Sequence, residues 1–133
     1  MELIKIAIVS EYTRQSSRDI KKLIFDIKNY FNDKDLMPHI YGIGRSNIQV
    51  DRNIQKYSLD LGLEYSEYTT TGDTLYSINR NKMNMFRRNI ILASVVDIGI
   101  FIVDNKGPKT KYDANLQSLI NEFVKRNKKY IFR

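Results

Sequence analysis

Side chains that can hold a phosphate or a ribose stand on both sides of one apolar run, residues 98–103. These side chains are Arg87, Arg88 and Asn89 before the run, and Asp104 and Asn105 after it. A guanidinium can contact a phosphate in a bidentate manner, and a carboxylate or amide at a strand end can bind ribose hydroxyls. The ordinary alternatives are a solvated helix face for the arginines and capping of the next turn for the other two.

Gly42 and Gly44, followed by Arg45, form a second candidate for phosphate binding. Glycine permits a tight turn and a close approach of backbone amides to an anion. Asn47 stands where a dinucleotide fingerprint has its third glycine, so a tight turn without a ligand is the alternative. The sequence has no GxxxxGK[ST] loop, which argues against ordinary P-loop chemistry.

Candidates for catalysis are few. Glu11 follows the first apolar run and is the carboxylate best placed for acid–base or nucleophilic work on a glycosidic carbon, and pairing with Arg14 or Arg18 is its alternative. The single histidine, His39, follows Pro38 at the start of an expected strand, which indicates a structural or surface role. The sequence therefore predicts no cofactor and no metal site.

The elements that must position these residues follow from apolar periodicity. Strands are expected at residues 3–9, 38–43, 63–69, 98–103 and 129–132. Between them we expect helices that start at a Ser16 or Ser17 cap, near residue 50, at residue 82 and at Thr110. The helix of residues 82–96 is expected to bury Met83, Phe86, Ile90, Ala93, Ile91 and Val95. Residues 74–81 are expected to form a loop over the ligand edge.

Strands that alternate with helices predict one parallel sheet with right-handed crossovers. We expect a single α/β domain over residues 1–133, a Rossmann-like three-layer sandwich with strand order 3-2-1-4-5. The order then reverses between the first and fourth strands. Residues 10–14 and 104–110 would meet there, at the carboxyl ends of the strands, where open α/β sheets bind ligands.

The composition limits the class of protein and its partners. The chain has 133 residues, of which 42% are hydrophobic and 28% charged, which is typical of one globular domain. A net charge of +7 favours anionic partners, although basic residues at a helix end, such as Lys125 and Lys128, also stabilise the helix dipole. Cysteine is absent, which excludes disulfides and indicates a cytoplasmic protein, and no signal peptide or membrane span is expected.

Three blocks of sequence resemble the SLOG superfamily of Rossmann-like domains, which includes the DprA and LOG proteins, and in particular its YspA-like branch. The first block ends in Ser10 and Glu11, and the second begins with Val50, Asp51 and Arg52 and continues through Ile54, Tyr57, Ser58 and Gly62. The third is Arg88 and Asn89, then Asp97, then Asp104 and Thr110. Asn105 and Lys109 stand where the family usually has glycines in the last loop.

This resemblance implies a nucleotide or nucleotide-derived ligand, such as a cyclic or ADP-ribose-like signal, that the protein senses or sequesters. Arg88 would contact phosphate, Asp104 or Asn105 ribose, and Tyr12 or Tyr76 would stack on a base. The full set of expected ligand residues is Ser10, Glu11, Tyr12, Arg14, Gly42, Gly44, Arg45, Asp51, Tyr76, Arg87, Arg88, Asn89, Asp104, Asn105, Lys109 and Thr110.

Two other functions remain open from the sequence. LOG-type phosphoribohydrolases carry a Pro-Gly-Gly-x-Gly-Thr-x-x-Glu motif that is absent here, so hydrolysis ranks below binding. An N-glycosidase or deoxyribosyltransferase-like enzyme would use Glu11 or Asp113. DprA-like binding of nucleic acid on the basic surface is the second alternative.

The resemblance also implies a homodimer or homotetramer, with Met83, Met85 and Phe86 as a candidate contact. Frequent Asn, Lys and Ile indicate an AT-rich bacterial or phage genome.

Overall fold

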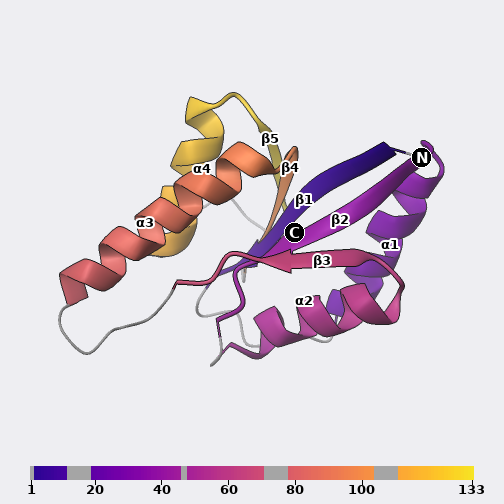
Figure 1. Ribbon diagram of the computed structural model, residues 1–133, viewed down its shortest axis with the longest axis horizontal. Helices are drawn as coiled ribbons and strands as arrows, with labels where there is room; N and C mark the ends of the chain where they lie inside the picture. The colour runs from indigo at the N-terminus through magenta and orange to yellow at the C-terminus, as the bar shows by residue number, and fades with distance from the viewer. Residues whose placement is uncertain (1, 12–18, 46–47, 71–77, 104–110) are drawn as a thin grey trace.

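Strands and helices alternate along the chain (Figure 1). The computed structural model describes residues 2–11, 19–45, 48–70, 78–103 and 111–133, and for residues 78–83 the backbone alone. In chain order the elements are β1 (Glu2–Ser10), α1 (Ile20–Asn32), β2 (Leu36–Gly42), α2 (Gln49–Asp60), β3 (Glu64–Glu67), α3 (Ile78–Val95), β4 (Ile98–Ile102), α4 (Ala114–Lys125) and β5 (Lys129–Phe132). The strands differ from their predicted ranges by at most two residues at either end.

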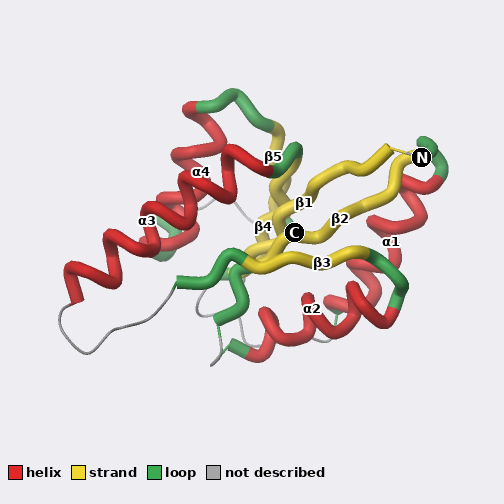
Figure 2. Tube along the Cα trace, viewed as in Figure 1, coloured by secondary structure: helices red, strands yellow, loops and turns green. Residues whose placement is uncertain are grey.

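The strands form one parallel sheet in the order β3-β2-β1-β4-β5, which confirms the predicted topology. Helices α1 and α2 cover one face of this sheet, and α3 and α4 cover the other (Figures 1 and 2). The protein therefore has an α/β Rossmann-like fold. Its order reverses between β1 and β4, so the carboxyl ends of these strands form the switch point where such sheets bind ligands.

Central strand β1 is buried on both faces because its residues alternate between two apolar cores. Ile6 and Ile8 belong to the core under α1 and α2. Ala7 and Val9 belong to the core under α3 and α4. This two-sided burial explains why residues 6–9 of the strand are continuously apolar rather than alternating.

Helix α1 begins later than the sequence predicts. Ser16 and Ser17 were expected to cap it but lie outside the described residues, and the helix starts at Ile20 with Asp19 at the N-cap position. Asp19 makes no side-chain capping bond to the helix. The prediction was wrong because serine is common both at caps and in loops, so a helix start cannot be placed from serine alone.

Helices α3 and α4 also begin at residues other than those predicted from the sequence. Helix α3 begins at Ile78 rather than residue 82, so the predicted loop is partly helical, and residues 71–77 lie outside the described residues. Helix α4 begins at Ala114 rather than residue 110 because Asp113 supplies its N-cap: the carboxylate accepts a hydrogen bond from the backbone N–H of Leu116 at 2.8 Å.

The buried face of α3 is only partly the predicted one: Ala93 is buried and Val95 partly buried as expected, and the side chain of Met83 lies outside the described residues. Phe86, Ile90 and Ile91 are 43%, 42% and 46% exposed, whereas Arg88 and Asn89 are buried. Leu92, Ala93 and Val96 continue the buried face toward the end of the helix. The helix is thus rotated relative to its apolar stripe, because two polar side chains take the place next to the sheet edge.

Gly99 in β4 leaves room for two aromatic rings. A Cβ atom at this position would lie 2.7 Å from Phe123 and 2.9 Å from Phe101, and both rings are fully buried. We expect Gly99→Ala to lower the free energy of unfolding by about 2 kcal/mol, because the ring must shift within a close-packed core. Urea denaturation of Gly99→Ala, Phe123→Leu and the double variant tests this. Strict additivity, or an unchanged midpoint for Gly99→Ala, would contradict the packing argument.

Candidate functional site

The end of β1 carries two buried polar residues at the switch point. Ser10 is fully buried and Glu11 is 5% exposed. The backbone N–H of Glu11 donates to the carbonyl of Ile102 at 2.9 Å, so this segment stays next to the end of β4. Polar side chains are rarely buried without a structural or functional reason. Both residues therefore lie at the carboxyl edge, where the sequence places a ligand.

Arg45, in the loop after β2, is held by Asp51 at the start of α2. Its backbone N–H and its Nε both donate to Oδ2 of Asp51 at 2.8 Å, and its Nη2 donates to Oδ1 at 3.1 Å. The same Nη2 donates to the carbonyl oxygen and the Oγ of Ser10, at 3.0 and 3.1 Å. Asp51 is 2% exposed, so its carboxylate is enclosed in this network. The pair joins the β2–α2 loop to the end of β1.

Local packing at Gly42 and the backbone conformation at Gly44 favour glycine. A Cβ at Gly42 would collide with the hydroxyl of Tyr65 in β3. Gly44 has a φ of +57°, and a Cβ there would lie 2.5 Å from the Glu67 carboxylate. That hydroxyl of Tyr65 donates to Glu67 at 2.8 Å. A tight turn against β3 is thus sufficient to explain both glycines without any phosphate.

Arg88 and Asn89 reach the same edge from α3 and contact the start of α4. Arg88 is 6% exposed, and its Nε donates to Oδ1 of Asn89 at 3.2 Å. Its Nη2 donates to Oδ1 of Asn115. Asn89 is fully buried, and its Nδ2 donates to Oδ1 and to the carbonyl oxygen of Asn115, at 3.1 and 3.2 Å. The predicted Arg-Asn pair is therefore a buried polar junction between two helices.

The charges of Arg45 and Arg88 are balanced differently. Asp51 pairs directly with Arg45, whereas no described carboxylate lies within ion-pair distance of Arg88. Burial and, to a smaller extent, the charge of Arg45 lower the pKa of Arg88 to about 10, against the opposing effect of Asp51. The guanidinium of Arg88 is nevertheless charged at neutral pH. Among the described residues, Arg88 therefore has no carboxylate partner of its own, whereas Arg45 does.

Two recesses adjoin this edge. One, of about 180 Å³, lies beside Arg88 between the end of β3 and α3, and its lining residues are Tyr68, Thr69, Thr70, Asn84, Arg87, Arg88 and Ile91. The other, of about 360 Å³, lies at the ends of β4 and β5 against the start of α1. Its apolar part is formed by Leu23, Ile102, Val103 and Phe132, and its charged part by Asp19, Lys22, Asp26 and Arg133. Ile102 is the register partner of Ser10, so the larger recess begins one strand from the Arg45 network.

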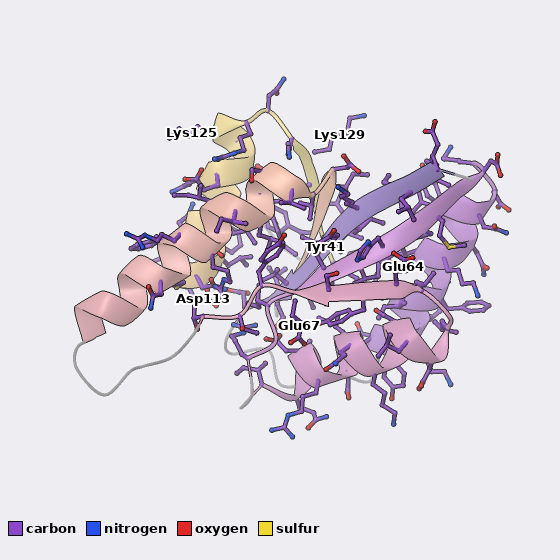
Figure 3. All side chains as sticks on the ribbon, in the orientation of Figure 1. Tyr41, Glu64, Glu67, Asp113, Lys125 and Lys129 are labelled. Atoms are coloured by element: carbon purple, nitrogen blue, oxygen red, sulfur yellow. The ribbon has the colours of Figure 1, made fainter. Side chains whose placement is uncertain are left out.

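Asp113, a candidate for enzymatic work, caps α4 (Figure 3). We expect Asp113→Ala to lower the free energy of unfolding by about 1 kcal/mol, whereas Asp113→Asn keeps most of the cap. Thermal or urea unfolding of both variants is the measurement. A matching loss in the asparagine variant would show that the carboxylate charge matters beyond capping.

His39 is part of the sheet and not of the edge. One ring nitrogen lies 2.8 Å from the hydroxyl of Ser66, the other lies 3.4 Å from Glu64, and the ring stacks on Tyr41. Within the part of the chain that the structure describes, no group of three or more His, Asp or Glu residues could hold a metal ion. In the same part, no helix is long and apolar enough to cross a membrane.

Some basic residues lie far from the candidate site. Lys125 and Lys129 stand at the end of α4 and the start of β5, which is the amino edge of the sheet (Figure 3). Nearby, Lys128 donates to the carbonyl oxygens of Ser94 and Val96 at 2.9 and 2.6 Å, at the end of α3. Part of the net positive charge therefore stabilises the carboxyl ends of helices, which is the alternative explanation given for these residues in the sequence.

The structure brings together only part of the predicted site. Hydrogen bonds join Ser10, Arg45 and Asp51 into one cluster next to Glu11, and Arg88 and Asn89 into a second cluster with Asn115, while Arg87 is exposed on α3. Gly42 and Gly44 form the turn against β3, and seven predicted residues lie outside the described residues: Tyr12, Arg14, Tyr76, Asp104, Asn105, Lys109 and Thr110. Sequence reasoning missed Asn115 and the Tyr68 side of the small recess. An asparagine two residues after a helix cap was the available signal for Asn115, but it is also a common surface residue.

Comparisons with known proteins assign the chain to no family. No family model matches the chain, and no curated protein matches it. One similar structure is the glycotransferase of kitacinnamycin, with a TM-score of 0.47 and 9% identity over 99% of this chain and 30% of that one. Another is a predicted subunit of tRNA methyltransferase from Methanocaldococcus jannaschii, with a TM-score of 0.44 and 16% identity over 97% of this chain and 67% of that one. The chain thus spans about 30% of the length of the glycotransferase.

Proposed function

We propose that this protein is a SLOG-like domain that binds a nucleotide or nucleotide-derived signal at the carboxyl edge of its sheet, either to sense or to sequester it. The observation that carries this proposal is Arg88, a buried guanidinium whose described hydrogen-bond acceptors are neutral amides. An anionic group of the ligand would supply the counter-charge that Arg88 does not receive from any described residue. A cyclic or ADP-ribose-like molecule fits this chemistry, because it combines phosphate with ribose and a base.

The two recesses suggest how such a ligand would lie. The small recess offers Arg87, Arg88 and two threonine hydroxyls to a phosphate. The large recess has an apolar part of suitable character for a nucleoside, and it approaches the site through the end of β1. In this arrangement Ser10 and Arg45 lie between the two ends of the ligand. Asp51 then acts on the ligand indirectly, by holding Arg45.

Calorimetry and thermal melting with a panel of mono-, di- and cyclic nucleotides and ADP-ribose test the proposal. We expect heat of binding and a raised melting temperature with at least one member of the panel. Absence of both with every member would overturn it. Binding without consumption of the ligand over long incubation separates a sensor from an enzyme.

Enzymatic cleavage is the second candidate, and buried Glu11 at the switch point favours it. In that case Glu11→Gln would abolish base release from the ligand but would leave binding measurable. Intact nucleotides after long incubation with the wild-type protein would exclude it.

Self-association also belongs to this proposal. The outer face of α3 exposes Phe86, Ile90 and Ile91, and burial of such a face against a second copy would yield a dimer or, with a further contact, a tetramer. Sedimentation analysis of the wild type and of Ile90→Lys would test this. A cytoplasmic location remains a prediction from the absence of cysteine.

A further inference from the structure

Asn115, near the start of α4, holds the side chains of both Arg88 and Asn89. Its Oδ1 accepts a hydrogen bond from Arg88 Nη2 and another from Asn89 Nδ2, the second at 3.1 Å. Its backbone carbonyl also accepts from Asn89 at 3.2 Å. Its own Nδ2 is buried and has no hydrogen-bond partner among the described residues. The Oδ1 atom of Asn115 thus accepts two hydrogen bonds, whereas its Nδ2 atom donates none to a described residue.

A carboxylate at position 115 would suit the folded protein better. It would remove the buried donor that lacks an acceptor and would neutralise the guanidinium beside it. Buried arginines are normally paired with such a carboxylate. The amide instead fixes the orientation of the guanidinium without cancelling its charge. Asn89 acts in the same way, since it too presents an amide oxygen to Arg88.

We propose that Asn115 is the positioning residue of the anion site: it aims Arg88, whose positive charge no described carboxylate compensates, so that a phosphate-type group of the ligand supplies the counter-charge. This inference rests on the proposed function and adds the residue that makes the site select an anion. The position of Asn115 in the first turn of α4 adds to the effect, because the helix dipole also favours negative charge there.

Asn115→Asp tests this proposal, with inorganic pyrophosphate as the probe and Asn121→Asp as the matched control. Asn121 is exposed on the same helix and accepts only a surface hydrogen bond from Gln117, at 2.9 Å. Both changes add the same charge to α4. We expect Asn115→Asp to weaken pyrophosphate binding about tenfold or more and to keep or raise the melting temperature. We expect Asn121→Asp to change neither by a comparable amount.

The salt dependence of binding provides a second measurement. It should not change if Asn115 has only a structural role. In Asn115→Asp the slope of log affinity against log salt should become shallower, because one protein cation no longer acts on the anion. Asn115→Ala, which removes the acceptor without adding charge, should bind only about threefold more weakly with the wild-type slope.

The outcomes separate this inference from the proposed function. If the wild type binds pyrophosphate or a nucleotide and Asn115→Asp binds equally well, the role of Asn115 is wrong while the proposed function stands. Equal losses in the aspartate and alanine variants, or a lowered melting temperature in Asn115→Asp, would also overturn it. If the wild type binds neither pyrophosphate nor any nucleotide, both fall.

Discussion

Arg88→Met is expected to weaken binding of ADP-ribose or pyrophosphate about 30-fold or more, because hydrogen bonds to charged groups contribute about 1.5–3 kcal/mol each. Arg88 is buried at the edge and its partners among the described residues are neutral amides, so its charge is available to the ligand. Methionine keeps the length and the apolar contacts of the side chain but removes the cation. The melting temperature should change little, and titration calorimetry of folded protein measures the loss.

The stability of Arg88→Met follows from the lowered pKa of Arg88. A pKa lowered to about 10 means that the charged guanidinium is less favourable in the folded than in the unfolded chain. This penalty is present at every pH below about 10 and is relieved as the pH rises above it. The methionine variant escapes the penalty, which offsets the lost hydrogen bonds. Asn115 Oδ1 also keeps its bond from Asn89.

Arg87→Met is the matched comparison for Arg88→Met. Arg87 is the next residue of α3 and lines the same recess, but it is exposed, so water screens its charge. We expect a loss of affinity of about threefold or less. Equal effects of the two changes would contradict the special place given to Arg88, and unchanged affinity of Arg88→Met would remove it from the site.

Asp51→Ala is expected to lower the free energy of unfolding by about 3 kcal/mol, because it leaves Arg45 without its buried counter-charge. Asp51 is 2% exposed and accepts three hydrogen bonds from Arg45, two from the side chain and one from the backbone. The side chain of Arg45 is 16% exposed and can turn partly toward water, which keeps the loss near the lower end for a broken buried pair. Urea denaturation measures it.

The control for this change lies on the same helix. Asp60 is exposed at the end of α2, so Asp60→Ala should alter the free energy of unfolding by no more than about 0.5 kcal/mol. The double variant Arg45→Met with Asp51→Ala should be less destabilised than the sum of its single changes, since neither charge is then left alone. Simple additivity would mean that Arg45 and Asp51 do not stabilise the fold as a pair.

The sheet could be predicted from the sequence because burial on both faces leaves a plain signal. Residues 98–102 and 6–9 read as continuous apolar runs rich in isoleucine, and helical periodicity lies between successive runs. Alternation of strand and helix then leaves few topologies. Helix starts were harder to predict from the sequence than strands were, because the cap of α4 is a single aspartate and Asp19 at the start of α1 makes no side-chain capping bond.

The candidate site was only partly predictable for a related reason. Apolar periodicity in α3 selects Phe86 and Ile90 as the buried face, yet Arg88 and Asn89 take that place. Local pattern and structure disagree most where a site requires buried polar groups, so this mismatch itself marks the site. The link to Asn115 could not be read from the chain, because 26 residues separate it from Asn89 and only the packing of α4 against α3 joins them.

The most direct test of ligand binding at the carboxyl edge is an NMR titration of the uniformly ¹⁵N-labelled protein with ADP-ribose and the nucleotide panel. We predict that a binding member shifts the backbone amide signals of Ser10, Glu11, Arg45, Arg88 and Asn115, and that Arg88→Met abolishes these shifts at the same ligand concentration. Shifts confined to the amino edge around Lys129, or no shifts with any member of the panel, would contradict the account.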